Sequence, residues 1–140
     1  MFDIKTYEDR LAQWSIFRSS LAQVEDPLAA VAEYYKDVEL VSQRYDPWDK
    51  NNWPNPWTII FENKYCLFLK TLGMCYSLML TEKYKDTDVK LMIIKDKDLQ
   101  TKYIAQIEHS ILGYTDDICL IDDIVNEIAV LNEYSLEKLH

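Results

Sequence analysis

The chain has 140 residues and carries 15 Lys and Arg against 24 Asp and Glu, so its formal net charge is −9. This excess of negative charge repels phosphates and anionic bilayers, which excludes nucleic acid and membranes as expected partners. With 49% hydrophobic residues and two glycines, the composition also excludes a disordered or fibrous chain and predicts one folded domain, residues 1–140.

Residues 1–45 are predicted to form a helical N-terminal part. Two apolar stripes recur there at three- and four-residue steps, which places each stripe on one helix face: Leu11, Trp14, Phe17 and Leu21, then Leu28, Val31, Tyr35 and Val38. Asp26-Pro27 marks the start of the second helix, because an Asp side chain accepts from free amides and Pro fits the first helical position.

Residues 46–57 are predicted to be an aromatic, proline-rich loop, because each of its prolines disfavours helix at the preceding residue. Its three tryptophans have two interpretations: a sugar- or peptide-binding surface, or anchors that hold the loop on the core. We favour anchors. Asn55-Pro56 repeats the pattern of cap and proline and opens a short helix through Phe61.

Residues 58–140 are predicted to hold a buried helix and a small antiparallel sheet. Asn63 is expected to cap a helix from Lys64 to Tyr84, which is apolar almost all round and so belongs in the core. Helices followed by strands give an α+β fold, with the N-terminal helices and the central helix packed on the sheet.

The hydrophobic period changes after Asp86, where alternation replaces the helical spacing. The tail, Asn126–His140, is expected to add an edge strand and a final helical turn. The other expected elements are three strands and the turns between them: Val89–Lys95, Asp96–Asp98 (turn), Tyr103–Tyr114, Thr115–Ile118 (turn) and Ile118–Val125.

His109 is the candidate base, since the other histidine ends the sequence. A histidine alone on the apolar face of a strand is more often a core residue. A hairpin turning at Thr115–Ile118, however, pairs His109 with Ile124 and places Asp122 one diagonal step away on the same face. A carboxylate there would orient the imidazole and stabilise its protonated form.

Cys66 completes a candidate catalytic site. It lies in the first turn of the predicted central helix, where free amides and the helix dipole stabilise a thiolate. A helix packed on the inner sheet face would align Cys66, His109 and Asp122, in the order of a papain-type thiol site. Asn63 is the candidate side-chain donor to an oxyanion.

The motifs around these residues resemble the transglutaminase-like superfamily, of papain-type fold, and within it the compact bacterial cysteine-proteinase branch. They are Trp53-Pro-Asn-Pro-Trp-Thr-Ile-Ile60, Asn63-Lys-Tyr-Cys66, Glu108-His-Ser-Ile-Leu112 and Cys119-Leu-Ile-Asp-Asp123. The resemblance implies a Cys66–His109–Asp122 triad and acyl transfer through a thioester, with amide or peptide bonds as substrates. Lys64-Tyr65 stand where the family usually has Gly-Asp, which leaves a second class of function open.

Two functions are therefore predicted. In the first, a thiol enzyme, Cys66 attacks an amide carbonyl, His109 transfers the proton and Asp122 orients His109. In the second, the fold is a catalytically silent structural or assembly component of a phage particle, because a small acidic protein rich in Asn, Lys, Tyr and Ile is similar in style to tailed-phage proteins. The expected partner is a protein or peptide, a second copy of the chain or a viral assembly.

Neither a metal nor another cofactor is expected. One internal histidine and scattered acids lack the ligand spacing of zinc sites, and no EF-hand pattern is present. The start of the chain lacks the pattern of a secretory signal, and Cys66, Cys75 and Cys119 lie in apolar stretches, as reduced thiols do. We expect a cytoplasmic location, or incorporation into a virion.

Overall fold

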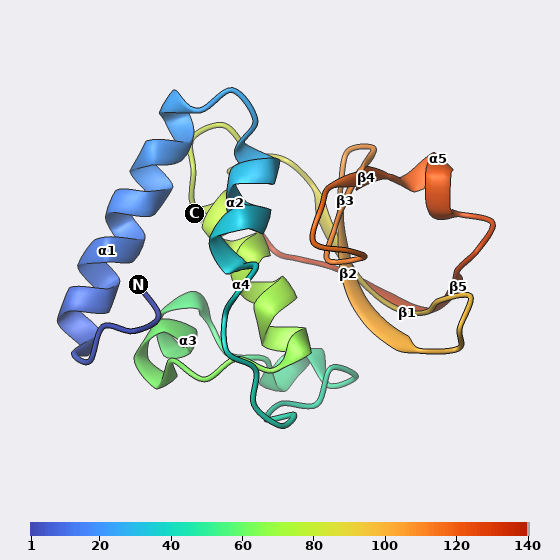
Figure 1. Cartoon of the computed structure of the whole chain (residues 1–140), viewed down its shortest axis with the longest axis horizontal. Helices are drawn as coiled ribbons and strands as arrows, with labels where there is room; N and C mark the ends of the chain where they lie inside the picture. Colours follow the sequence, from blue (N-terminus) through green and yellow to red (C-terminus); the bar gives the residue numbers. More distant parts are fainter. Residues whose placement is uncertain (140) are drawn as a thin grey trace.

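A computed structural model describes residues 1–139, which form five α-helices and a five-stranded antiparallel sheet. The predicted α+β class is therefore confirmed. The helices are α1 (Tyr7–Ser20), α2 (Pro27–Tyr35), α3 (Pro56–Glu62), α4 (Leu67–Met79) and α5 (Ile121–Ile124). Figure 1 shows α1 to α4 gathered on one side of the molecule, with the sheet and α5 on the other.

Two helices begin where the sequence predicts. The Asp26 carboxylate accepts from the Ala29 amide at 3.2 Å, and the Asn55 side chain accepts from the Thr58 amide at 2.8 Å. A proline occupies the first turn in both helices, where its missing amide hydrogen costs no hydrogen bond. These caps define the N-terminal ends of α2 and α3.

The central helix α4 is shorter than predicted, and the predicted role of Asn63 at its start is wrong. Asn63 instead ends α3 in the left-handed conformation, with a φ of 51°, which asparagine tolerates better than most residues. Its side-chain amide donates to the Phe2 carbonyl at 2.9 Å. Cys66 is the residue immediately before α4, and the helix ends at Met79 rather than Tyr84.

The sheet has the strand order β4-β3-β2-β1-β5, so β1 and β2 lie inside it. Its strands are β1 (Val89–Lys95), β2 (Thr101–Ile107), β3 (Ser110–Leu112), β4 (Cys119–Leu120) and β5 (Ala129–Ser135). Strand β1 has the predicted bounds and contains four consecutive buried residues, Leu91 to Ile94. Such a run is typical of a strand covered on both faces.

Two strand predictions are wrong. The segment Tyr103–Tyr114 is not one strand but parts of β2 and β3, which are joined by a turn at Glu108 and His109. Glu108 has a φ of 56°, and this turn lacks the glycine or asparagine that usually marks such a site. The segment Ile118–Val125 contains only the two residues of β4 before α5 begins.

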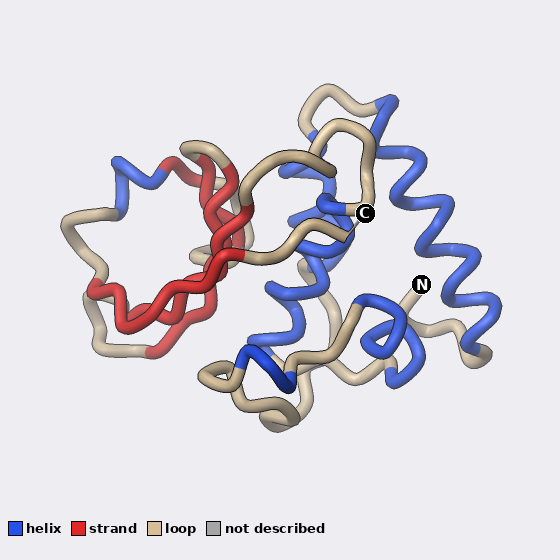
Figure 2. Tube along the Cα trace, turned by 180° about the vertical axis from the view of Figure 1, so that it is seen from behind, coloured by secondary structure: helices blue, strands red, loops and turns tan. Residues whose placement is uncertain are grey.

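The tail is predicted correctly in its first half. Strand β5 lies at one edge of the sheet, paired with β1. The expected final helical turn is absent from residues 136–139, which have no regular secondary structure, and His140 lies outside the described residues. Figure 2 shows helices and strands as two groups, joined by the loops that lead into β1 and out of β5.

The hydrophobic core has two parts, one on each face of the sheet. The larger part joins α2, α4 and the sheet and includes Phe68, Leu72 and Leu91, all fully buried. The smaller part, on the opposite face, is closed by α5. It consists of Met92, Ile94, Ile104, Ile111, Tyr114 and Ile124.

A buried polar network fixes α4 against the N-terminal helices. The indole of Trp14 donates to the Ser77 hydroxyl at 2.9 Å, and the Tyr35 hydroxyl lies 3.0 Å from the same atom. Ser77 in turn donates to the Gly73 carbonyl at 2.9 Å. The ring of Tyr35 packs closely on Gly73, where a β-carbon would lie 3.1 Å from that ring.

Candidate functional site

Cys66, the residue immediately before α4, is buried in the core, with 1% of its surface exposed. Burial raises the pKa of the nearby Tyr103 phenol, and the neighbouring Cys66 thiol adds to that rise. Cys66 immediately precedes α4, which is tied to the first half of β2 by the hydrogen bond from Thr71 to the Tyr103 carbonyl. A nucleophile must be reached by its substrate, and this sulfur is enclosed.

His109 is exposed in the turn between β2 and β3, which corrects the prediction that it faces inward from a strand. Its carbonyl accepts from the Ile121 amide at 2.9 Å, so the start of α5 lies beside this turn. Asp122 follows on α5 and is exposed. The predicted pairing of His109 with Ile124 is wrong, since the chain enters a helix where that pairing needs a strand.

The structure brings two of the three predicted triad residues to one end of the sheet and leaves the third at the other. Within residues 1–139, no hydrogen bond or ion pair joins the side chains of Cys66, His109 and Asp122. Four residues separate Tyr103 from the end of β2, about 13 Å of strand. Asn63, the candidate oxyanion donor, is bonded to Phe2 instead.

The aromatic loop, residues 46–57, is held on the core by one of its three tryptophans. The ring of Trp53 packs on Phe68 at 5.1 Å and on Tyr134 at 5.0 Å. This residue behaves as the anchor that the sequence predicts. Trp57 lies in the first turn of α3 rather than in the predicted loop, and its ring, like that of Trp48, is about half exposed.

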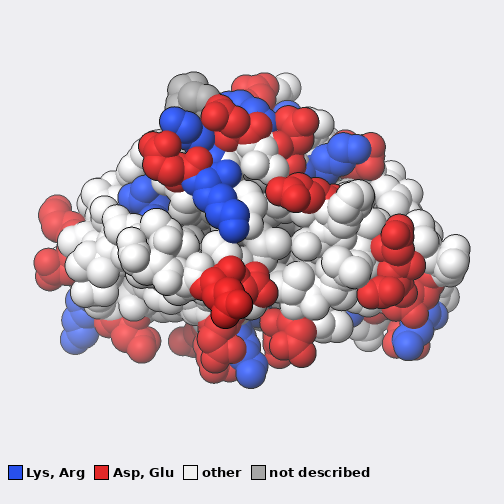
Figure 3. Space-filling view, turned by 90° about the horizontal axis from the view of Figure 1, so that it is seen from above, with Lys and Arg blue, Asp and Glu red and all other residues white. Residues whose placement is uncertain are grey.

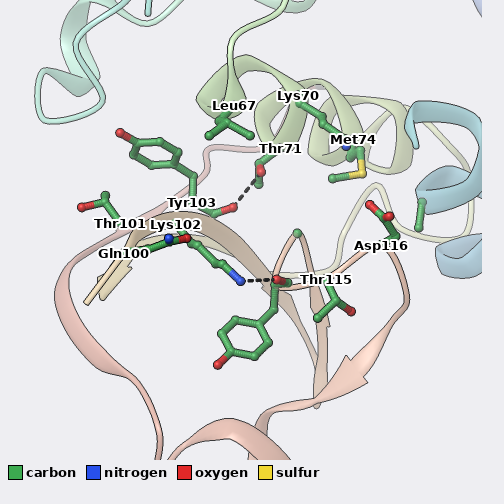
Figure 4. Close-up of a pocket in the computed structure, with 13 residues that line it drawn as sticks. Leu67, Lys70, Thr71, Met74, Gln100, Thr101, Lys102, Tyr103, Thr115 and Asp116 are labelled. Atoms are coloured by element: carbon green, nitrogen blue, oxygen red, sulfur yellow. Dashed lines mark hydrogen bonds between the residues drawn. The ribbon is translucent and has the colours of Figure 1, made fainter. Parts of the chain in front are cut away.

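An open groove of about 490 Å³ lies between α4 and the sheet. Figure 4 shows Leu67, Lys70 and Met74 of α4 along one wall, with residues of β2 opposite. The loop after β3 closes one end with residues 113–116. Leu67 is 55% exposed, although it is a large apolar residue beside the core.

Gly113 allows the two walls of the groove to approach. The Thr71 hydroxyl donates to the Tyr103 carbonyl at 2.7 Å, which ties α4 to β2 (Figure 4). A β-carbon on Gly113 would lie 2.8 Å from that carbonyl oxygen and 3.0 Å from the Thr71 hydroxyl. The φ of Gly113 is +90°, which favours glycine. No sequence motif had marked this residue.

The two lysines of the groove differ in their partners. The Lys102 ammonium donates to the Tyr114 carbonyl at 2.9 Å and lies 3.5 Å from the Asp96 carboxylate. The Lys70 ammonium lies 3.4 Å from the Lys36 carbonyl, and no carboxylate of residues 1–139 pairs with it. Lys70 is therefore a cation that a ligand in the groove can reach.

Other site types receive no support from the described part of the chain. Residues 1–139 contain no group of three His, Cys, Asp or Glu side chains placed to hold a metal ion. No helix in this range is long and apolar enough to cross a membrane. The chain matches no protein-family model, no curated protein and no solved structure.

Proposed function

We propose that the protein is a non-catalytic binding component, the second of the two functions predicted from the sequence. The observation that supports it best is the α4–β2 groove, the volume of about 490 Å³ lined by exposed Leu67 and by Lys70, with which no carboxylate of residues 1–139 pairs. Volumes of this size accept a few side chains of a ligand. The enclosed Cys66 and the distant His109 favour this proposal over thiol catalysis.

The charges in the groove favour an acidic partner segment. Two lysines, Lys70 and Lys102, and one carboxylate, Asp116, line it, whereas the whole chain is strongly negative. Because Lys102 is already paired with Asp96, Lys70 is the cation that remains to attract a carboxylate, and exposed Leu67 offers an apolar surface. The proposed ligand is a peptide segment of a partner protein in which an acidic residue lies beside an apolar one.

The β5 edge of the sheet is a weaker candidate for such a segment, because two of its outward backbone groups are already paired. The Leu136 amide donates to the Val89 carbonyl, so the backbone groups of Glu133 and Ser135 point outward. The Asn132 side chain accepts from the Glu133 amide at 2.9 Å, and the Lys50 ammonium donates to the Ser135 carbonyl at 2.6 Å. Capped groups do not pair with an added strand.

The distribution of surface charge does not favour a nucleic acid as the partner. On the face seen in Figure 3, acidic side chains lie next to the basic ones, which form no long continuous stripe. A phosphate backbone needs a continuous series of cations along its path. This face does not provide that series.

Selection from a random octapeptide library tests the proposal. We expect selected peptides that carry Asp or Glu next to Leu, Met or Phe, and we expect Leu67→Asp to weaken their binding about tenfold or more. Leu120→Asp is the matched control, because Leu120 is equally exposed, at 51%, but lies on β4 away from the groove. Peptides that bind Leu67→Asp as well as the unmodified protein contradict the proposal.

Alkylation with iodoacetamide tests the thiol enzyme directly. Under the binding proposal, partly exposed Cys119 reacts first, and Cys66 reacts no faster than fully buried Cys75. Mass spectrometry of the native protein resolves the three sites. A Cys66 that reacts faster than Cys119, and that is slowed by His109→Ala, would establish thiol chemistry and overturn the proposal.

A further inference from the structure

A second hollow, of about 320 Å³, lies where the ends of α1 and α4 meet, apart from the α4–β2 groove. Its polar lining includes Arg18, Ser19 and Lys83. Its apolar lining includes Leu21, Pro27 and Leu80. The hollow therefore has a cationic part and an apolar part.

Arg18 is the unusual residue of this hollow. Its guanidinium stacks on the Trp14 ring at 4.2 Å, and its Nε atom is buried without a hydrogen-bond partner among residues 1–139. Burial lowers the pKa of Arg18, and no carboxylate of the described chain pairs with it. A partly desolvated guanidinium without an anion beside it costs free energy, so an anion that binds its accessible terminal nitrogens would be stabilising.

The stacking holds Arg18 in place before any ligand arrives. The Trp14 ring is fully buried, and its Nε1 hydrogen is fixed by the Ser77 hydroxyl at 2.9 Å. A guanidinium held on a fixed ring loses little conformational entropy when it binds an anion. The site is thus preorganised.

The other charged groups at the hollow leave room for an anion. Glu82 lines it as well, but its carboxylate is paired with Lys85 at 3.1 Å. The Lys83 ammonium lies 5.4 Å from the Tyr84 ring and is not paired with a carboxylate of residues 1–139. Two cations therefore line one hollow without a matching anion.

We propose that this hollow binds a small carboxylate with an apolar body, its carboxylate on Arg18 and Lys83 and its body against Leu21, Pro27 and Leu80. Guanidinium groups bind carboxylates through paired N–H donors, which the two terminal nitrogens of Arg18 provide. The volume suits a short aliphatic or aromatic acid. This site is separate from the proposed peptide groove, so each proposal stands or fails without the other.

Titration with hexanoate, followed by NMR, tests the site in the full chain. The Trp14 indole and Arg18 Nε–H signals should shift saturably, with a dissociation constant in the millimolar range or below (about −4 kcal/mol or stronger). Acetate and inorganic phosphate, at the same ionic strength, should bind more weakly, because they lack the apolar body. No saturable shift with hexanoate overturns the proposal, and phosphate binding as tight as hexanoate overturns the apolar part of it.

Variants assign the binding to Arg18. Arg18→Gln should weaken hexanoate binding about tenfold or more, and Arg18→Lys should weaken it less. Arg44→Gln is the matched control, since Arg44 is a surface arginine paired with Glu62 and lies outside the hollow. Thermal unfolding of each variant checks that the fold is retained. Hexanoate binding that is unchanged in a folded Arg18→Gln protein contradicts the assignment.

Discussion

The two faces of the sheet are covered in different ways. One face packs on α4, behind which α1 and α2 form a second layer held by the Trp14–Ser77–Tyr35 network. The other face carries five buried residues covered by Ile124 of α5, a helix of only four residues, and by the chain beside it. Strand β1 therefore contributes side chains to a thick part of the core on one face of the sheet and to a thin part on the other.

The largest expected loss of stability comes from a substitution in the thick part of the core. Leu72→Ala should lower the free energy of unfolding by about 4 kcal/mol, because Leu72 is fully buried in a helix packed on both sides. Ile124→Ala, on the thin side, should cost about 2 kcal/mol, since short surface α5 can move to fill the space. Urea unfolding measures both. Equal losses would contradict the difference between the faces.

The close approach of α4 to the sheet provides a second test. Gly113→Ala should cost more than about 2 kcal/mol, because its β-carbon meets backbone at 2.8 Å and its φ is positive. Gly73→Ala should change stability by about 1 kcal/mol or less, since it gains helix propensity and only the Tyr35 side chain must yield. A Gly73→Ala loss as large as that of Gly113→Ala would show that Tyr35 cannot move.

The Trp14–Ser77–Tyr35 network in the thick part of the core provides a third test of stability. Ser77→Ala should cost about 1 to 2 kcal/mol, because the buried Trp14 indole loses its acceptor. Ser20→Ala is the control, since its hydroxyl bond to the Phe17 carbonyl is exposed. Thermal unfolding compares the two variants. A loss of the same size in both would mean that water replaces Ser77 as acceptor.

The smallest expected effect depends on pH and belongs to the turn between β1 and β2. Hydrogen bonds from the Gln100 and Asp98 amides, together with Lys102, hold the pKa of Asp96 below its usual value. The folded state therefore gains stability above the unfolded pKa of about 4 and loses it as the pH falls through the lower folded pKa. Asp96→Asn should lower the thermal midpoint at pH 7.

The same variant checks the sign of this effect in acid. The difference in midpoint between Asp96→Asn and the unmodified protein should shrink below about pH 4, where the unfolded chain begins to take up the proton, and should vanish as the pH falls through the lower folded pKa. Thermal scans at steps from pH 7 to pH 2.5 measure it. A difference that grows in acid would contradict the assignment of the lowered pKa to Asp96.

The sequence predicted the elements whose signals are local. Asp26-Pro27, Asn55-Pro56 and the apolar run of β1 each carry their information within a few residues, and each is confirmed. Glu108 and His109 form a turn without typical turn residues. The alternation of apolar and polar residues before and after this turn therefore predicted a single strand. That single error moved His109 from an inward face to an exposed turn.

The candidate site depended on contacts that no local pattern contains. The predicted triad required a hairpin register, and the chain enters α5 where that register needed β-strand. The groove and the unpaired Arg18 depend on residues far apart in sequence, such as Thr71 with Tyr103 and Trp14 with Ser77. An Arg four residues after a Trp, one helical turn apart, was the only available signal for the Arg18 stack.

The contacts of the aromatic loop also set an order of events during synthesis. Lys50 donates to the Ser135 carbonyl, and the Tyr134 hydroxyl donates to the Trp48 carbonyl at 3.2 Å. Residues 48 and 50 are translated more than 80 residues before these partners, which at about 5 to 20 residues per second means several seconds. Until β5 emerges, the Trp53 ring and the Trp48 carbonyl lack their contacts with Tyr134, and a ribosome that pauses before residue 134 would prolong the exposure of this loop to chaperones.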